Sequence, residues 1–143
     1  MTVYYEDLKV GQSASMTRTI TERDIQLFGE ATGDMNPLHF DEAYARKTVF
    51  RGRVAHGVLA IGFMSAVMGN QLPGPGSIFI SASTTFKGPV RIGDTVVTTC
   101  TVKELHEGRK VVMDCRCEVN GKLVVEGEGL VLAPKKPSLA SGA

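Results

Sequence analysis

This sequence has few cysteines, almost no net charge and no long apolar run, and each absence excludes a class of protein. Three cysteines cannot form a closed disulfide framework, which favours a reducing, cytoplasmic compartment over secretion. The formal net charge is +1, and no block of like charges offers the electrostatic footprint that nucleic-acid binding requires. The longest apolar segment, residues 57–69, is shorter than the ~20 residues of a membrane-spanning helix. The N-terminus has no basic segment leading into an apolar run, so no signal peptide is expected.

The composition that remains is that of one folded domain. The chain has 143 residues, of which 43% are hydrophobic and 22% charged, and these values exclude a disordered chain and a coiled coil. We expect a single domain over residues 1–133, because no repeat or linker interrupts them. Residues 134–143 are polar, contain proline and lack periodicity, which is typical of a loose tail.

The first third of the chain predicts two short helices. Thr21 and Asp24 form the pattern of a capping box, and apolar residues recur at helical spacing from Ile25 until Gly33 ends the pattern. Asp41 can cap the second helix. The segment between the two helices is punctuated by glycine, asparagine and proline, so it is expected to be a loop.

The middle of the chain predicts a third helix, which is buried. Residues 57–69 are apolar on every side of a helix rather than along one stripe. A helix of this kind belongs in a protein core. We therefore expect the rest of the fold to wrap around it.

The second half of the chain predicts strands. Residues 95–102, 110–119 and 122–133 are rich in β-branched residues and alternate with period two. Asn120 and Gly121 suit a type I′ hairpin turn between the last two, and Glu107 with Gly108 marks another tight turn. With residues 77–88 in front, they predict a meander of at least four antiparallel strands, to which the N-terminal segment is a candidate addition. A buried helix against such a sheet is an α+β fold.

One loop concentrates polar side chains that could carry chemistry. In GDMNPLH a carboxylate, a carboxamide and an imidazole occur within six residues, as Asp34, Asn36 and His39, with Pro37 stiffening the turn. Such a cluster can hold and activate one water molecule. The alternative is that these residues only form a turn, because turns use Asp, Asn and Pro constantly.

A second candidate is AHG at the start of the apolar helix. The first N–H groups of a helix have no intrahelical partner and lie at the positive end of its dipole, so the Gly57 amide can donate to a developing oxyanion. The alternative is a close packing contact that requires glycine. His56 could equally be an ordinary core histidine.

Taken together, these motifs resemble the MaoC-like dehydratase family, and within it the short single-domain (R)-specific enoyl-CoA hydratases. The resemblance covers nearly the whole chain, and its centre is the GDMNPLH loop followed by AHG. It implies a hot-dog fold, in which a curved antiparallel sheet wraps a long central helix, and a homodimer. It also implies reversible hydration of a trans-2-enoyl thioester to the (R)-3-hydroxyacyl thioester, without a cofactor.

The resemblance also assigns site residues. The catalytic pair of the family matches Asp34 and His39, its oxyanion-hole amide matches Gly57, and its supporting residues match Asn36 and Ser65. Two groups that hold one water from the same side of the substrate would give syn addition. The sequence does not divide the roles of acid and base between Asp34 and His39.

A metal site is not expected, because Cys100, Cys115 and Cys117 lack the spacing of metal ligands. Candidate partners for the phosphates of CoA are the basic residues Arg46, Lys47, Arg51, Arg53, Lys87 and Arg91. Candidate lining residues of an acyl tunnel are Phe63, Met64 and Leu72.

Three other functions stay open on the sequence. The chain could be a 3-hydroxyacyl-ACP dehydratase, which performs the same chemistry on a different carrier. It could hydrolyse the thioester, although the GDMNPLH loop disfavours this. It could also be a non-catalytic module that binds acyl thioesters. The acyl chain length and the metabolic pathway are not determined by the sequence.

Overall fold

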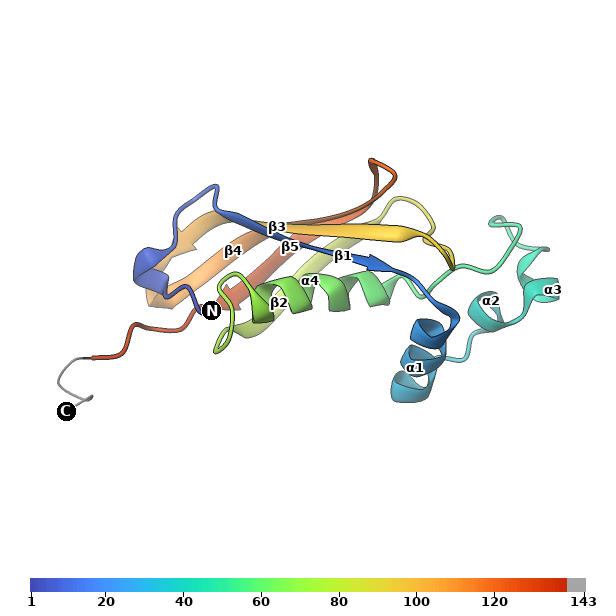
Figure 1. The fold of residues 1–143 in the computed structure, drawn as a ribbon, viewed down its shortest axis with the longest axis horizontal. Coiled ribbons are helices and arrows are strands. Elements are labelled where there is room, and N and C mark those ends of the chain that lie inside the picture. The colour runs from blue at the N-terminus through green and yellow to red at the C-terminus, as the bar shows by residue number, and fades with distance from the viewer. Residues whose placement is uncertain (139–143) are drawn as a thin grey trace.

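In a computed structural model that describes residues 1–138, one antiparallel sheet lies against one long helix (Figure 1). The strands are β1 Ser13–Thr19, β2 Ile78–Phe86, β3 Thr95–His106, β4 Lys110–Val119 and β5 Lys122–Leu132. The α-helices are α1 Glu22–Thr32, α2 Pro37–Phe40, α3 Glu42–Ala45 and α4 Val58–Asn70. Two 3-10 turns are η1 Tyr5–Asp7 and η2 Glu107–Arg109. The α+β class expected from the sequence is confirmed.

The strand order is β1-β3-β4-β5-β2, with every neighbouring pair antiparallel. The prediction that residues 77–88 begin the meander is wrong. β2 lies at the far edge of the sheet beside β5, with Ile78 opposite Leu132. The reason is the path of α4. This helix contacts both edge strands and the middle of the sheet, so it carries the chain from the β1 edge to the opposite edge, where β2 begins. Only β3, β4 and β5 are joined as consecutive hairpins, and the N-terminal strand β1 pairs with β3.

Local turn chemistry determines how the meander folds back. Asn120 and Gly121 have φ angles of 51° and 77°, as a type I′ turn between two twisted strands requires. Gly108, with a φ of 75°, turns the chain between β3 and β4. Both turns occur where the sequence predicted them.

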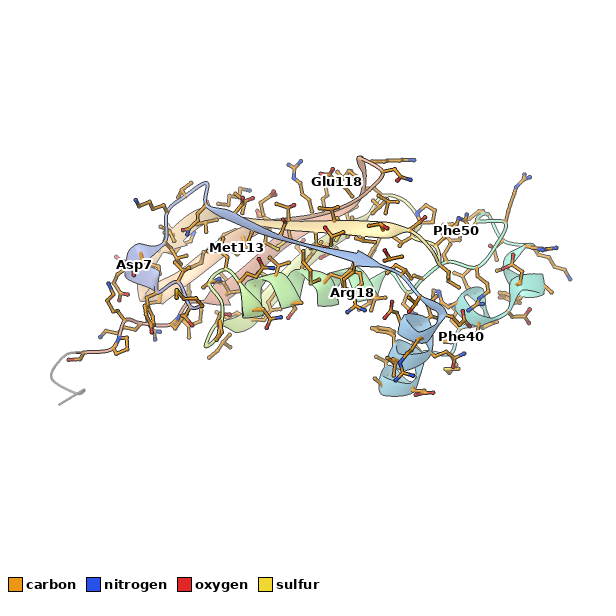
Figure 2. The ribbon with its side chains drawn as sticks, in the orientation of Figure 1. Asp7, Arg18, Phe40, Phe50, Met113 and Glu118 are labelled. Carbon is orange, nitrogen blue, oxygen red and sulfur yellow. The ribbon has the colours of Figure 1, made fainter. Side chains whose placement is uncertain are left out.

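The core lies between α4 and one face of the sheet. In β4 the alternate residues Val111, Met113, Cys115 and Cys117 are fully buried, because successive side chains in a strand point to opposite faces. Figure 2 shows Met113 on the side that faces α4 and Glu118 on the opposite side. The three cysteines are free thiols within this core.

The helix α4 is only half covered by this sheet. Its inner face is buried and consists of Ala60, Phe63, Met64, Val67 and Met68. On the outer face Val58 is 53% exposed and Gly62 is exposed as well. The expected packing of this apolar helix against an antiparallel sheet is confirmed, and the outer face of α4 stays uncovered because a sheet packs on one side of a helix. The outer face carries small residues, which limits the apolar area that it presents to solvent.

The helices α1, α2 and α3 lie together at one end of the sheet, next to the first residues of α4 (Figure 1). The N-terminus and the last described residues, 134–138, lie toward the opposite end. Among the described residues there is no helix long and apolar enough to cross a membrane.

Residues 134–138 have no helix or strand and run beside η1. The Tyr5 N–H donates to the Pro134 carbonyl, and the Lys136 N–H donates to Glu6. The remainder of the predicted tail, residues 139–143, lies outside the described residues. The domain boundary at residue 133 stays a prediction.

Candidate active site

The end of α1 places Asp34. The capping box at the start of this helix is present, with the Thr21 side chain accepting from the Asp24 N–H and the Asp24 side chain accepting from the Thr21 N–H. Gly33 ends the helix with a φ of 80°, a conformation that favours glycine. Asp34 follows at once, its N–H donating to the Thr32 hydroxyl. Its carboxylate accepts from the Asn36 N–H at 3.3 Å and is exposed in the single chain.

His39 lies on a one-turn helix, whereas the sequence predicted a loop. The Asn36 side chain caps α2 by accepting from the Leu38 N–H at 3.1 Å, and Pro37 occupies the first helical position. An Asn cap followed by Pro is a standard helix start. Asn36 therefore supports His39 through the backbone of α2.

The surroundings of His39 determine which of its ring nitrogens can act as a base. The side chain is only 8% exposed, and Nδ1 lies 2.8 Å from the Val54 carbonyl oxygen. A carbonyl can only accept, so Nδ1 carries the proton and the neutral ring keeps its lone pair on Nε2. Burial lowers the pKa of His39 from its ordinary value of 6.5, and the nearby His56 and Arg53 add to this effect. The Val54 carbonyl and Asp34 act in the opposite direction.

His56 stacks against His39. Their ring centroids lie 4.0 Å apart with the planes inclined by 32°, and Phe28 covers His56 with its ring centroid at 4.6 Å. His56 Nε2 donates to the Asp34 carbonyl oxygen at 3.0 Å. His56 is 3% exposed, and its Nδ1 is buried without a hydrogen-bond partner among the described residues. An unpaired buried polar atom costs about 1–3 kcal/mol.

The fold thus brings Asp34, His39 and His56 together. One carboxylate oxygen and one ring nitrogen from each histidine lie within 4.8 Å of one another. A water molecule with hydrogen bonds of ~2.8 Å can bridge atoms at such separations.

Gly57 is the N-cap residue of α4, directly before Val58. The N–H groups at a helix start have no partner within the helix, so the Gly57 amide can donate to a ligand. A Cβ atom at this position would lie 3.0 Å from the Phe86 ring, which is a tight contact. The packing interpretation is therefore supported by the contact with Phe86, and the oxyanion role of the Gly57 amide stays a prediction.

A mainly apolar cavity of about 320 Å³ opens beside these groups. His39, His56 and Gly57 line one part of it. The apolar part of the lining includes Leu38, Phe50, Leu59, Phe63, Phe86 and Val90. Of the predicted tunnel residues Phe63 lines the cavity, whereas Met64 and Leu72 belong to the core and do not.

Three of the predicted site residues, Asp34, Asn36 and Ser65, are not among the residues that line this cavity. Asp34 lies at its edge, within reach of His39 but not among the lining residues. Ser65 lies on α4 about 12 Å along the helix axis from Gly57, and it is half-buried. Among residues 1–138 no hydrogen bond joins Ser65 to Asp34 or His39, so its role stays a prediction.

The structure uses two of the six candidate phosphate partners for another purpose. Arg53 donates from Nε to the His39 carbonyl at 2.7 Å, and its Nη2 donates to both carboxylate oxygens of Glu22. Arg91 donates to the carbonyls of Arg53 and Phe50. Both guanidinium groups therefore hold the segments around His39 together.

The other four candidates lie at the surface. Lys87 lines the cavity and pairs with Glu126 at 3.2 Å. Arg46 pairs with Glu42, while Lys47 and Arg51 are exposed.

Sequence reasoning missed the connections made by Arg53 and His56. Nothing in the local pattern shows that Arg53 reaches α1 and α2, because its partners are 14 and 31 residues away. For His56 the only available signal was its position directly before Gly57.

Comparisons with known proteins agree with this geometry. The MaoC like domain matches residues 7–122. An (R)-specific enoyl-CoA hydratase from Rhodospirillum rubrum is 52% identical over 93% of each chain. A 3-hydroxybutyryl-CoA dehydratase from Methylorubrum extorquens is 44% identical over 94% of this chain and 86% of its own. Among solved structures, the unliganded R-hydratase PhaJ1 from Pseudomonas aeruginosa has a TM-score of 0.89 and 41% identity, covering 94% of this chain and 88% of its own.

Proposed function

Because the chain belongs to the MaoC-like domain family, we propose that it is a hydro-lyase that adds water to trans-2-enoyl-CoA and forms (R)-3-hydroxyacyl-CoA, reversibly. The names of its relatives as (R)-specific enoyl-CoA hydratase and 3-hydroxybutyryl-CoA dehydratase support this reaction. The observation that carries the proposal is His39, which keeps Nε2 unprotonated, lies beside Asp34 and lines an apolar cavity together with Gly57.

His39 is the general base in this mechanism. Its Nδ1 proton is held by the Val54 carbonyl, so Nε2 accepts a proton from the water that attacks C3 of the substrate. A C3–O bond forms, and the electrons of the double bond move toward the thioester oxygen. Asp34 orients the water and stabilises the imidazolium that results.

Gly57 stabilises the charge that develops on the thioester oxygen. Its N–H lies at the positive end of the α4 dipole, where a donor to an oxyanion contributes about 2.7–4 kcal/mol. The His39 imidazolium then returns its proton to C2, which completes the addition and restores the neutral ring. Water and proton come from the same side, so the addition is syn.

The surroundings of Asp34 and His39 suit an acyl thioester. The apolar cavity beside His39 and Gly57 can take the acyl chain. Lys87 at the cavity and the exposed Arg46, Lys47 and Arg51 are available to phosphates of the carrier. The free thiols of the core agree with a cytoplasmic location.

A homodimer is part of the proposal. The strand β2 is an unpaired edge of the sheet, and it exposes Ile78 by 57% and Ile80 by 47%. An exposed apolar edge strand favours pairing with another strand. The outer face of α4 at Val58 and Gly62 is exposed as well, and so is Asp34. A second copy paired along β2 would extend the sheet and cover apolar surface.

We expect Ile80→Lys to shift the protein from dimer to monomer, because a charged side chain on an edge strand opposes strand pairing. Light scattering after size-exclusion chromatography measures the change. Lys122→Ala, at the start of β5 and away from the β2 edge, serves as the control. A wild-type protein that is monomeric at micromolar concentration would contradict the dimer.

The test of the reaction is the loss of enoyl-thioester absorbance when the purified protein meets crotonyl-CoA, followed by chiral analysis of the product. Rapid formation of the (R)-3-hydroxy product supports the proposal. Faster turnover of the matched ACP thioester would favour a 3-hydroxyacyl-ACP dehydratase, and release of free thiol would indicate thioester hydrolysis. Binding of the thioester without chemical change would indicate a binding module.

A further inference from the structure

His56 connects three parts of the site that are separate in the sequence. Its Nε2 donates to the Asp34 carbonyl, its ring stacks on His39, and its backbone continues directly into Gly57. The Asp34 bond spans 22 residues. A change in the position of this ring would therefore move the carboxylate, the imidazole and the amide relative to one another.

The two stacked histidines hold opposite tautomers. His39 faces the Val54 carbonyl with Nδ1, so its proton is on Nδ1 and its lone pair on Nε2. His56 faces the Asp34 carbonyl with Nε2, so its proton is on Nε2. Each assignment follows because a carbonyl oxygen accepts hydrogen bonds and cannot donate them.

Packing alone does not account for a histidine at this position. The His56 ring lies among the rings of Phe28, Phe40 and His39, where a phenylalanine would fill similar space. His56 instead buries an Nδ1 atom that has no partner among the described residues, which is unfavourable. The compensating interaction is the Nε2–H bond to Asp34, the only hydrogen bond of this ring in residues 1–138.

We propose that His56 is a positioning residue of the active site. Its Nε2–H holds the Asp34 backbone, and its ring sets the position of His39. This inference rests on the proposed hydratase function, in which Asp34 and His39 hold one water molecule. His56 lines the cavity, but in this role it acts on the chemical step through Asp34 and His39 and not by contact with the reacting atoms.

Two substitutions separate the hydrogen bond from the packing. His56→Phe keeps an aromatic ring and removes the donor, whereas His56→Gln places an amide N–H near the position of Nε2. We expect H56F to lower kcat roughly 10–100-fold, as the loss of a supporting hydrogen bond does at other sites, with little change in KM. H56Q should recover most of kcat. His106→Phe, at the exposed end of β3, is the matched control and should leave kcat unchanged.

The tautomers can be read in the wild-type protein by ¹⁵N NMR of its three histidines. We expect a protonated Nε2 on His56 and a protonated Nδ1 on His39. This measurement does not depend on activity, so it tests the arrangement even if crotonyl-CoA is not a substrate, and it applies if H56F fails to fold.

A His56 ring protonated on Nδ1 alone would overturn the proposal. An unchanged kcat in folded H56F would overturn it too, as would equal losses of kcat in H56F and H56Q. A large rise in KM with kcat retained would assign His56 to substrate binding instead, which also contradicts a positioning role.

Discussion

The two ends of the molecule bury different kinds of side chain. Between α4 and the sheet the core is apolar apart from Thr98, whose hydroxyl lies 3.3 Å from the Cys117 sulfur. At the end formed by α1, α2 and the start of α4, two histidines are buried. Within residues 1–138, His56 leaves Nδ1 without a hydrogen-bond partner, and His39 keeps a lone pair on Nε2. The first region stabilises the fold. The second region buries polar groups, which lowers the stability of the fold but leaves these groups available for chemistry.

If this contrast is right, substitutions in the two regions should have separate effects. Changes at the polar end should reduce turnover and leave the fold stable. Changes in the apolar core should reduce stability and leave the turnover of folded molecules largely intact.

The largest expected effect is that of Asp34→Asn on activity. The substitution is nearly isosteric and keeps an oxygen for the Asn36 N–H, but it removes the charge that orients water and stabilises the His39 imidazolium. We expect turnover of crotonyl-CoA to fall by about 10²–10⁴-fold, with an unchanged melting temperature. Asp41→Asn, which retains the cap of α3, is the matched control. Full activity in D34N would refute the assignment of Asp34.

Met113→Ala in the apolar core should have the opposite effect: it should lower the free energy of unfolding and leave the turnover of folded molecules largely intact. Met113 is fully buried between the sheet and α4, and truncation of a buried Met costs about 2–5 kcal/mol. Urea denaturation measures this loss in the free energy of unfolding. Val97→Ala on the exposed side of β3 should change it by less than ~0.5 kcal/mol. Equal losses in the two variants would argue against a core at this position.

The pH dependence should reveal the buried base. Burial lowers the pKa of His39 below 6.5. We therefore expect kcat/KM at pH 6.5 to stay close to its value at neutral pH and to fall only at a lower pH, where His39 becomes protonated. A decline centred at or above pH 6.5 would contradict His39 as the base.

The same group affects stability in the same pH range. The unfolded chain takes up the His39 proton near pH 6.5, before the folded protein does, so the folded state loses stability as the pH falls from 6.5 toward the lower pKa of His39. Denaturation midpoints measured from pH 7.5 to 5 in wild type and His39→Gln should show a steeper decline in the wild type.

The smallest effect concerns the helix that leads to Asp34. Thr21→Ala removes the side-chain acceptor of the capping box and should cost about 1 kcal/mol. Thr21→Ser keeps the acceptor and should be close to neutral. Thermal unfolding compares the two variants, and equal melting temperatures would show that the cap contributes nothing.

Much of the fold could be predicted from the sequence, because the signals for its helix ends, turns and strand faces are local. The capping box at Thr21, the αL glycine at Gly33 and the Asn120–Gly121 turn depend on residues within a few positions of each other. The buried face of β4 follows from alternation along a single strand. Local patterns could not place β2, because its pairing with β5 depends on the path of α4 beneath the sheet.

The sequence by itself determined which residues could perform the chemistry, since the spacing of Asp34, His39 and Gly57 carries the resemblance to the MaoC-like family. Only the tertiary structure decided how they work together. Val54 sets the tautomer of His39, Arg53 ties its backbone to α1, and His56 joins it to Asp34. The partners of these bonds are 14 to 31 residues apart. The hydrogen bonds of a ring or a guanidinium depend on which groups the folded chain brings within about 3 Å, and no local pattern encodes that.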